Sequence, residues 1–92
     1  MKFFNWSVEK NLKLKKERGI SFEDILFYIS NDCLLDIIQH PDKDKYQNQK
    51  IFVLNIEDYI YYVPFIENED EIYLKTIIPS RKLTKKYLGR KK

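Results

Sequence analysis

The sequence predicts an α+β domain in which a small antiparallel sheet follows two helices and precedes a third, in the order β-α-α-β-β-β-β-α. Apolar residues with helical spacing are confined to two segments near the start and one near the end. Between these segments the chain consists of short β-branched and aromatic runs separated by polar turns. The 92 residues, 43% of them hydrophobic, suffice for one core, so residues 1–92 are expected to form a single domain.

The N-terminal part carries the helix signals. Residues 3–6 are expected to form an edge strand, after which Ser7 caps a first helix and Gly19 ends it. Ser21 opens a second helix, with Asp24 at the capping-box position three residues later. The apolar face of this second helix follows the spacing i, i+3, i+4, i+7 at Phe22, Ile25, Leu26 and Ile29.

The strands follow the two helices. They are expected over residues 34–39, 50–56, 59–66 and 72–78. The two central strands pair through a turn at Glu57 and Asp58, which lacks the usual Asn-Gly chemistry. Pro64 is expected at a sheet edge or a bulge, because proline cannot donate to a ladder. Pro79 and Ser80 stop the last strand and cap a final helix. The large aromatic residues expected in the core are Trp6, Phe22 and Tyr62.

Charge is unevenly distributed along a chain whose formal net charge is +3. Residues 80–92 hold seven Lys and Arg and no acidic residue, and residues 1–18 are also rich in lysine. The acidic block between them consists of Glu67, Glu69, Asp70 and Glu71. If the two basic ends meet in space, they form a face for a polyanion such as nucleic acid. The alternative is that these lysines only solvate the ends of the chain.

The composition excludes several kinds of site. Cys33 and His40 are the only cysteine and histidine, which leaves neither an internal disulfide nor a zinc site of ordinary composition. Two glycines are too few for a phosphate loop or a dinucleotide fingerprint, so no cofactor is expected. The paired acidic residues fall at expected helix starts or turns, so no metal is expected either, and a carboxylate–metal nuclease is the unsupported alternative. No apolar run is long enough for a leader peptide or a membrane span, and we therefore expect a cytoplasmic protein without membrane contact.

The remaining side chains suit metal-independent cleavage of RNA, in which the 2′-hydroxyl attacks the adjacent phosphate. This reaction needs a general base, a general acid and cations around the crowded phosphorane. Arginine binds two phosphate oxygens at once, and Lys, Tyr or His can move the proton. The same residues permit two other functions: a module that binds nucleic acid or the ribosome without cleavage, and a protein-interaction module with an exposed strand edge.

Two segments of the chain resemble the BrnT family of type II toxins. The matching residues near the start are Trp6, Lys10, Asn11, Gly19, Ile20, Ser21 and Phe22. The second segment is Ile-Ile-Pro-Ser-Arg-Lys-Leu-Thr over residues 77–84, followed by Tyr87. The family's Lys-His pair before the glycine falls on Glu17 and Arg18, so Arg18 would supply positive charge at that place.

This resemblance implies a RelE-like ribonuclease fold and arrest of growth or translation by endoribonucleolytic cleavage of RNA, expected to be mRNA. It also implies a cognate antitoxin, often with a ribbon-helix-helix DNA-binding part. The expected assemblies are a homodimer of the toxin or a toxin–antitoxin heterotetramer.

The candidates for catalysis are Arg81, Arg18, Tyr46 and Lys50. The candidates for binding nucleic acid are Lys15, Lys82, Lys85 and His40. Arg81 is the first choice for a phosphate-binding cation, because it follows the last strand and begins the final helix; the alternative is a surface arginine beside a cap. Tyr46 could instead cover the core from its loop, and His40 could be structural in its turn. The mechanism requires Arg18 and Arg81 to share a cavity across the sheet.

Overall fold

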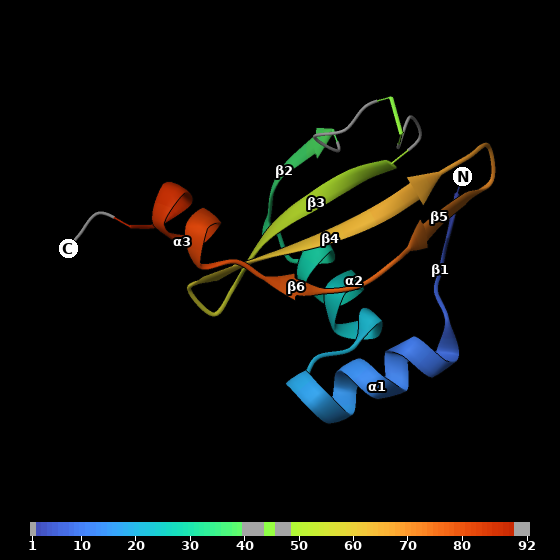
Figure 1. Ribbon diagram of the computed structural model, residues 1–92, viewed down its shortest axis with the longest axis horizontal. Coiled ribbons are helices and arrows are strands. Elements are labelled where there is room, and N and C mark those ends of the chain that lie inside the picture. The colour runs from blue at the N-terminus through green and yellow to red at the C-terminus, as the bar shows by residue number, and fades with distance from the viewer. Residues whose placement is uncertain (1, 40–43, 46–48, 90–92) are drawn as a thin grey trace.

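The computed structural model describes residues 2–39, 44–45 and 49–89. Its elements in chain order are β1 (Phe3–Asn5), α1 (Val8–Arg18), α2 (Phe22–Ser30), β2 (Leu34–Gln39), β3 (Gln49–Ile56), β4 (Tyr59–Glu67), β5 (Glu71–Leu74), β6 (Ile78–Pro79) and α3 (Arg81–Tyr87) (Figure 1). The α+β class is therefore confirmed, with helices before and after the main run of strands.

A serine precedes and caps each of the helices α1, α2 and α3. The hydroxyls of Ser7, Ser21 and Ser80 each accept a hydrogen bond from the backbone N–H three residues further on. In α2 the capping box is complete, because the Asp24 carboxylate accepts the Ser21 N–H at 2.9 Å. Gly19 ends α1 with a φ of 70°, a left-handed conformation that a residue with a Cβ adopts only at a cost. The predicted helix ends are confirmed.

The sheet is mixed rather than wholly antiparallel. Its strand order is β1-β5-β4-β3-β2, and β6 pairs with β4 as well. The pairs among β2, β3, β4 and β5 are antiparallel, whereas β1 runs parallel to β5, with Phe4 opposite Ile72. The prediction of an antiparallel sheet is therefore wrong at this edge. A long connection through α1, α2 and three strands separates β1 from β5, and such a connection permits parallel pairing.

The single strand expected over residues 72–78 is divided into β5 and β6, and the division lies beside Pro64 of the neighbouring strand β4. The Pro64 carbonyl accepts the Lys75 N–H at 2.8 Å, so the backbone polar groups of Pro64 face the segment between β5 and β6. Because proline has no N–H, the ladder lacks a donor at this point. β5 pairs with the residues after Pro64, and β6 pairs with Tyr61 and Tyr62 before it. Pro64 thus lies at a gap in the pairing of a central strand, not at a sheet edge.

The main core lies between the sheet and the helices α1 and α2. Its buried members are Leu14, Ile20, Phe22, Ile25, Phe52, Leu54, Ile56, Val63, Phe65, Leu74 and Ile77. Trp6 packs on this cluster with its ring stacked on Phe22, and both residues are where the sequence predicted. Ile51, Val53 and Ile60 are buried outside the cluster, as strand alternation requires of side chains on the opposite face. Within the described residues, no helix has the length and apolar character needed to span a membrane.

Candidate nucleic-acid interface

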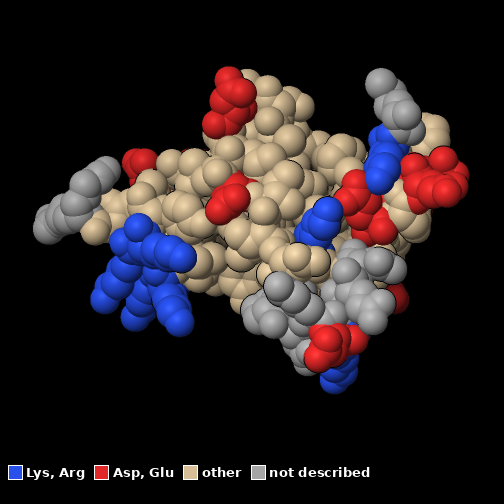
Figure 2. Space-filling model, turned by 90° about the horizontal axis from the view of Figure 1, so that it is seen from above, with Lys and Arg blue, Asp and Glu red and all other residues tan. Residues whose placement is uncertain are grey.

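α3 carries a group of cations that we call the α3 basic cluster: Arg81, Lys82, Lys85 and Lys86. All four side chains are exposed, and the helix contains no acidic residue. Figure 2 shows these blue side chains gathered at the α3 end of the molecule. The ion pairs found in the described part of the chain use other lysines, Lys2 and Lys50. The cluster is therefore a local concentration of positive charge that attracts polyanions.

The sheet is hollowed beside this cluster. The depression, which we call the sheet hollow, has a volume of about 510 Å³ and is lined by Ile38, Ile51, Tyr62, Pro64, Ile78, Ser80, Lys82 and Leu83. Its walls are mainly apolar, and its polar side-chain groups are one phenol, one hydroxyl and one ammonium. This volume falls in the range of small-ligand sites. Lys82 belongs to both the cluster and the hollow.

Strand alternation explains why Tyr62 lines the hollow. The neighbouring Val63 is fully buried in the core beneath α1 and α2, so Tyr62 points to the opposite face. It lies opposite Ile78 of β6, which lines the same hollow. The prediction that Tyr62 belongs to the core is therefore wrong: the residue is half-buried and faces the open side of the sheet. The alternation was visible in the sequence, but not which face stays open.

Hydrogen bonds near both ends of α3 hold it against the sheet. The Ser80 N–H donates to the Ile60 carbonyl, and the Ile60 N–H donates to Thr84 Oγ1, both at 2.9 Å. The Tyr87 hydroxyl donates to Asp36 Oδ2 of β2 at 3.2 Å. Burial, and then the hydrogen bond and charge of Asp36, raise the pKa of Tyr87. Tyr87 therefore keeps its proton at neutral pH and positions α3 as a donor.

Arg18 lies on the helix-covered side of the sheet. Its Nη1 donates to the Ile77 carbonyl at 2.8 Å. The second hollow, about 360 Å³, is lined by Arg18, Gly19, Ile20, Asp24, Tyr28, Ile56, Glu57, Tyr59 and Tyr61. The Tyr28 hydroxyl donates to Glu57 Oε2 at 3.4 Å, and burial together with the Glu57 charge raises the pKa of Tyr28. Two carboxylates beside one arginine make this hollow a poor site for a phosphate.

Lys50 also points away from the sheet hollow. It lies opposite Phe65, a core residue, so its side chain projects to the helix-covered face, whereas the next residue, Ile51, lines the hollow. Its Nζ lies 3.4 Å from Glu67 Oε1, and the Nζ of Lys2 lies 2.6 Å from Glu67 Oε2. The hydrogen bond from Lys2 is the main reason why the pKa of Glu67 is lowered. Lys50 is thus part of an ion-pair network.

The structure brings only some of the sequence candidates together. Those on α3 are Arg81, Lys82 and Lys85. Lys15 is exposed on α1, and the two remaining loop candidates, His40 and Tyr46, lie outside the described residues. Arg18 lines the second hollow, and neither that hollow nor the sheet hollow is lined by both Arg18 and Arg81. The expected cavity shared by Arg18 and Arg81 is not seen in these two hollows, and the candidate interface is the α3 side with Tyr62.

The described residues hold no group of three or more His, Cys, Asp or Glu placed to bind a metal ion. No protein-family model, curated protein sequence or solved structure matches the chain. The likeness to BrnT toxins therefore rests on the two sequence segments alone. The second of them forms β6 and most of α3, which are the elements that build the candidate interface.

Proposed function

We propose that this protein binds single-stranded RNA on the open face of its sheet and acts as the RNA-cleaving toxin of a type II toxin–antitoxin pair. The observation that supports this proposal is the position of the α3 basic cluster at the rim of the sheet hollow. Lys82 of the cluster and Tyr62 of β4 line the same space. A cation and an aromatic ring side by side are what an unpaired nucleotide requires.

The two parts of the interface match the two parts of a nucleotide. The cations of α3 attract the backbone phosphates and account for affinity that depends on salt. The apolar hollow with Tyr62 accepts a base, which stacks on the ring without selecting a sequence. A duplex cannot present its bases in this way, so the interface favours single strands, loops and ends.

Cleavage would proceed by attack of the ribose 2′-oxygen on the adjacent phosphorus. The 5′-oxygen leaves with a proton, and the products are a 2′,3′-cyclic phosphate and a 5′-hydroxyl. Arg81 and Lys82 would stabilise the additional charge on the phosphorane oxygens, which is the main catalytic need of this reaction. Lys82 and Tyr62, which line the hollow, carry exchangeable protons for the acid and base steps.

The wider assignment follows from the resemblance. The helix order and the position of residues 77–84 support a RelE-like, BrnT-like toxin that acts on mRNA in the cytoplasm. A cognate antitoxin would have to cover the α3 basic cluster, and acidic side chains on the antitoxin would complement it. An isolated toxin would then be active, and the complex inactive.

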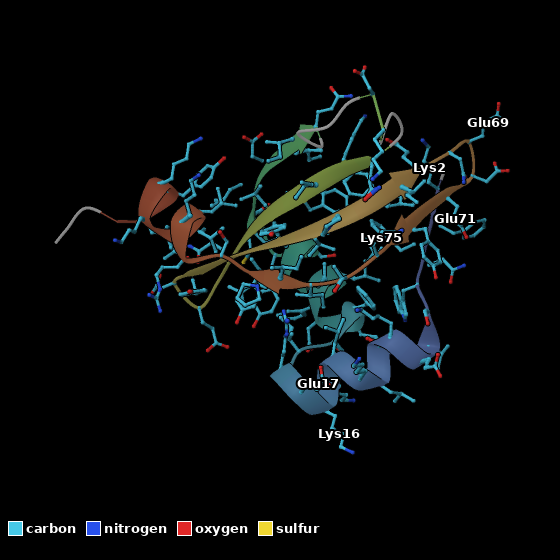
Figure 3. The ribbon with its side chains drawn as sticks, viewed as in Figure 1. Lys2, Lys16, Glu17, Glu69, Glu71 and Lys75 are labelled. Atoms are coloured by element: carbon cyan, nitrogen blue, oxygen red, sulfur yellow. The ribbon has the colours of Figure 1, made fainter. Side chains whose placement is uncertain are left out.

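The experiment incubates purified protein with end-labelled, unstructured RNA in the presence of a chelator. Wild-type protein should release fragments that carry 5′-hydroxyl ends, and RNA with 2′-O-methyl riboses should stay intact. The double variant Arg81→Ala/Lys82→Ala should cleave at least about 100-fold more slowly, because it lacks the charges that stabilise the phosphorane. Lys16→Ala is a control for the loss of a single surface charge, since Lys16 points away from the sheet on the outer side of α1 (Figure 3).

A second candidate function is RNA binding without cleavage. The described lining of the sheet hollow contains no histidine and no carboxylate, the commonest proton-transfer groups of such enzymes. In that case wild-type protein would bind RNA with strong salt dependence and yield no product at any protein concentration. If the RNA stays intact at a saturating concentration of wild-type protein, the proposal of cleavage is rejected and the proposal of RNA binding is kept.

A protein-interaction module is the third candidate. β2 is an edge strand, and its Leu35 and Ile37 are 43% and 50% exposed. An extended partner segment could pair with such an edge. A complex that survives high salt, formed by a protein without affinity for RNA, would favour this function over the other two.

A further inference from the structure

A second cationic hollow lies between α1 and the end of β5. We call it the lysine hollow; its volume is about 640 Å³ and its lining is Ser7, Glu9, Lys10, Lys13, Tyr73 and Lys75. Three ammonium groups and one carboxylate give it a net charge of about +2 at neutral pH. None of the three lysines takes part in the ion pairs seen in the described residues, which involve Lys2 and Lys50. This hollow is therefore electropositive.

The lysine hollow continues the face that carries the sheet hollow. Tyr73 lies opposite Ile66, two residues beyond Pro64 on the same side of β4, so its ring shares the face of Tyr62. The Lys75 N–H donates to the Pro64 carbonyl at 2.8 Å, and Pro64 lines the sheet hollow. One backbone hydrogen bond thus links a lining residue of the sheet hollow to a lining residue of the lysine hollow. Figure 3 shows Lys75 where the chain leaves β5.

Along this face, two groups of cations flank two aromatic rings. The order runs from the α3 basic cluster over Tyr62 and Pro64 to Tyr73, Lys75 and the lysines of α1. Tyrosine rings can stack on bases, and the cations at either end of the face can bind backbone phosphates, the two kinds of contact used by proteins that hold a single strand along a groove. The acidic residues Glu67 and Glu71 lie at the other end of β5, away from Lys75.

We propose that the lysine hollow, through Lys10, Lys13 and Lys75 beside Tyr73, is a second subsite for the backbone of single-stranded RNA. The strand would run from α3 across the open face of the sheet to the first turns of α1. This inference rests on the RNA binding proposed above and adds the path of the strand and a minimum length of substrate. A short oligonucleotide fills only the sheet hollow, and a longer one also reaches the lysine hollow.

The test compares 5′-labelled 2′-O-methyl oligouridylates of roughly four and roughly ten nucleotides by fluorescence anisotropy at low salt. The 2′-O-methyl group prevents the 2′-oxygen from attacking, so the measurement reports binding alone. Lys13→Glu replaces a positive charge in the lining of the lysine hollow by a negative one. Lys16→Glu makes the same charge change on the same helix, at a side chain that points away from the sheet (Figure 3).

Lys13→Glu should weaken binding of the longer oligonucleotide by at least about tenfold and of the shorter by less than about twofold. The triple variant Lys10→Ala/Lys13→Ala/Lys75→Ala should also lower the slope of log K against log salt by about 2, since each phosphate contact on a single strand accounts for about 0.7. Lys16→Glu should leave both affinities within about twofold of wild type. Circular dichroism establishes that the variants are folded.

Equal effects of Lys13→Glu and Lys16→Glu on the longer oligonucleotide would overturn the inference, because they would reflect net charge rather than a subsite. Equal loss for both lengths in Lys13→Glu would overturn it as well. The failure of the proposed function looks different: wild-type protein would then bind neither oligonucleotide. Arg81→Ala/Lys82→Ala separates the two subsites, because it should weaken both lengths.

Discussion

Asn11, one of the residues that resemble the BrnT pattern, has a structural role: it connects α1 to α2. It is buried in α1, its Oδ1 accepts the Phe22 N–H at 2.7 Å, and its Nδ2 donates to Glu23 Oε1 at 2.8 Å. These bonds fix the start of α2 against α1 and satisfy a buried donor that the helix cannot satisfy itself. Asn11 therefore positions the helix pair and has no contact with the candidate interface.

Replacing Asn11 by alanine should destabilise the protein by about 1–3 kcal/mol, because the Phe22 N–H would lose its partner in a buried place. The free energy of unfolding from urea titration measures this change. Leu12→Ala is the matched control: its side chain is 63% exposed, and we expect a change within about 0.5 kcal/mol. Similar losses in the two variants would mean that the two hydrogen bonds of Asn11 contribute nothing.

Glu67 is expected to make the free energy of unfolding decrease at acid pH. Lys2 and, less strongly, Lys50 hold its pKa below the ordinary value of 4.5 in the folded protein. A carboxyl with a lowered pKa stabilises the fold above its ordinary pKa, and this contribution is lost as the pH falls through the folded-state value. Stability should therefore fall more steeply below about pH 4.5 in wild-type protein than in Glu67→Gln.

Urea titrations at several pH values measure this difference. Lys2→Ala should reduce the acid dependence as Glu67→Gln does, because the Lys2 hydrogen bond is the main cause of the lowered pKa. An acid dependence that stays at the wild-type steepness in both variants would contradict the assignment.

At the scale of elements, the candidate interface depends on the attachment of α3 to the sheet, because α3 carries the basic cluster and lines part of the sheet hollow. Thr84 Oγ1 accepts the Ile60 N–H at 2.9 Å and donates to the Ser80 carbonyl at 2.7 Å. β6 is only two residues long and pairs with Tyr61 and Tyr62, so the Ile60 N–H of β4 has no strand partner on that side. The first bond satisfies this N–H. The same hydroxyl therefore links the pairing of the sheet to the position of the basic cluster.

Thr84→Val keeps the shape of the side chain and removes both hydrogen bonds. We expect a loss of about 1–3 kcal/mol in the free energy of unfolding and faster hydrogen exchange at the Ile60 amide. RNA binding should weaken as well, because α3 would be held less firmly beside the sheet hollow. Lys86→Ala serves as a surface control for stability; an Ile60 amide equally protected in Thr84→Val and wild type would refute this role.

At the scale of the whole molecule, one core connects the N-terminal segment to the sheet. Trp6 stacks on Phe22 with ring centroids 5.6 Å apart, and Phe22 belongs to the cluster that includes Leu74 and Ile77 near the other end of the chain. β1 pairs with β5, so both ends of the sequence enter one sheet. We expect a chain built in this way to unfold as one unit.

Tryptophan fluorescence and far-ultraviolet circular dichroism should therefore give the same urea midpoint. Trp6 reports the packing of the core near α2, whereas circular dichroism reports helices and strands throughout. Coincident transitions are expected of a two-state domain of this size. A fluorescence transition at clearly lower urea would show that the β1 segment detaches before the sheet unfolds.

The features that depend only on neighbouring residues could be predicted from the sequence. Ser7, Ser21 and Ser80 cap helices because a hydroxyl reaches the backbone three residues on, and Gly19 ends α1 because it has no Cβ. The charge of residues 81–86 was likewise visible, and so was the alternation that sends Tyr62 and Val63 to opposite faces. Such signals act over a few residues and need no knowledge of the partner.

The tertiary structure decided which segments meet. Parallel pairing of β1 with β5, division of the last strand at Pro64, and the placement of Arg18 against the Ile77 carbonyl all depend on contacts between distant residues. Strand alternation predicts which residues share a face of the sheet, but not which face the helices cover. The sequence therefore could not show that Lys50 lies on the helix-covered face, away from the sheet hollow. Partner choice is made by the energy of the whole packed arrangement, which no local pattern encodes.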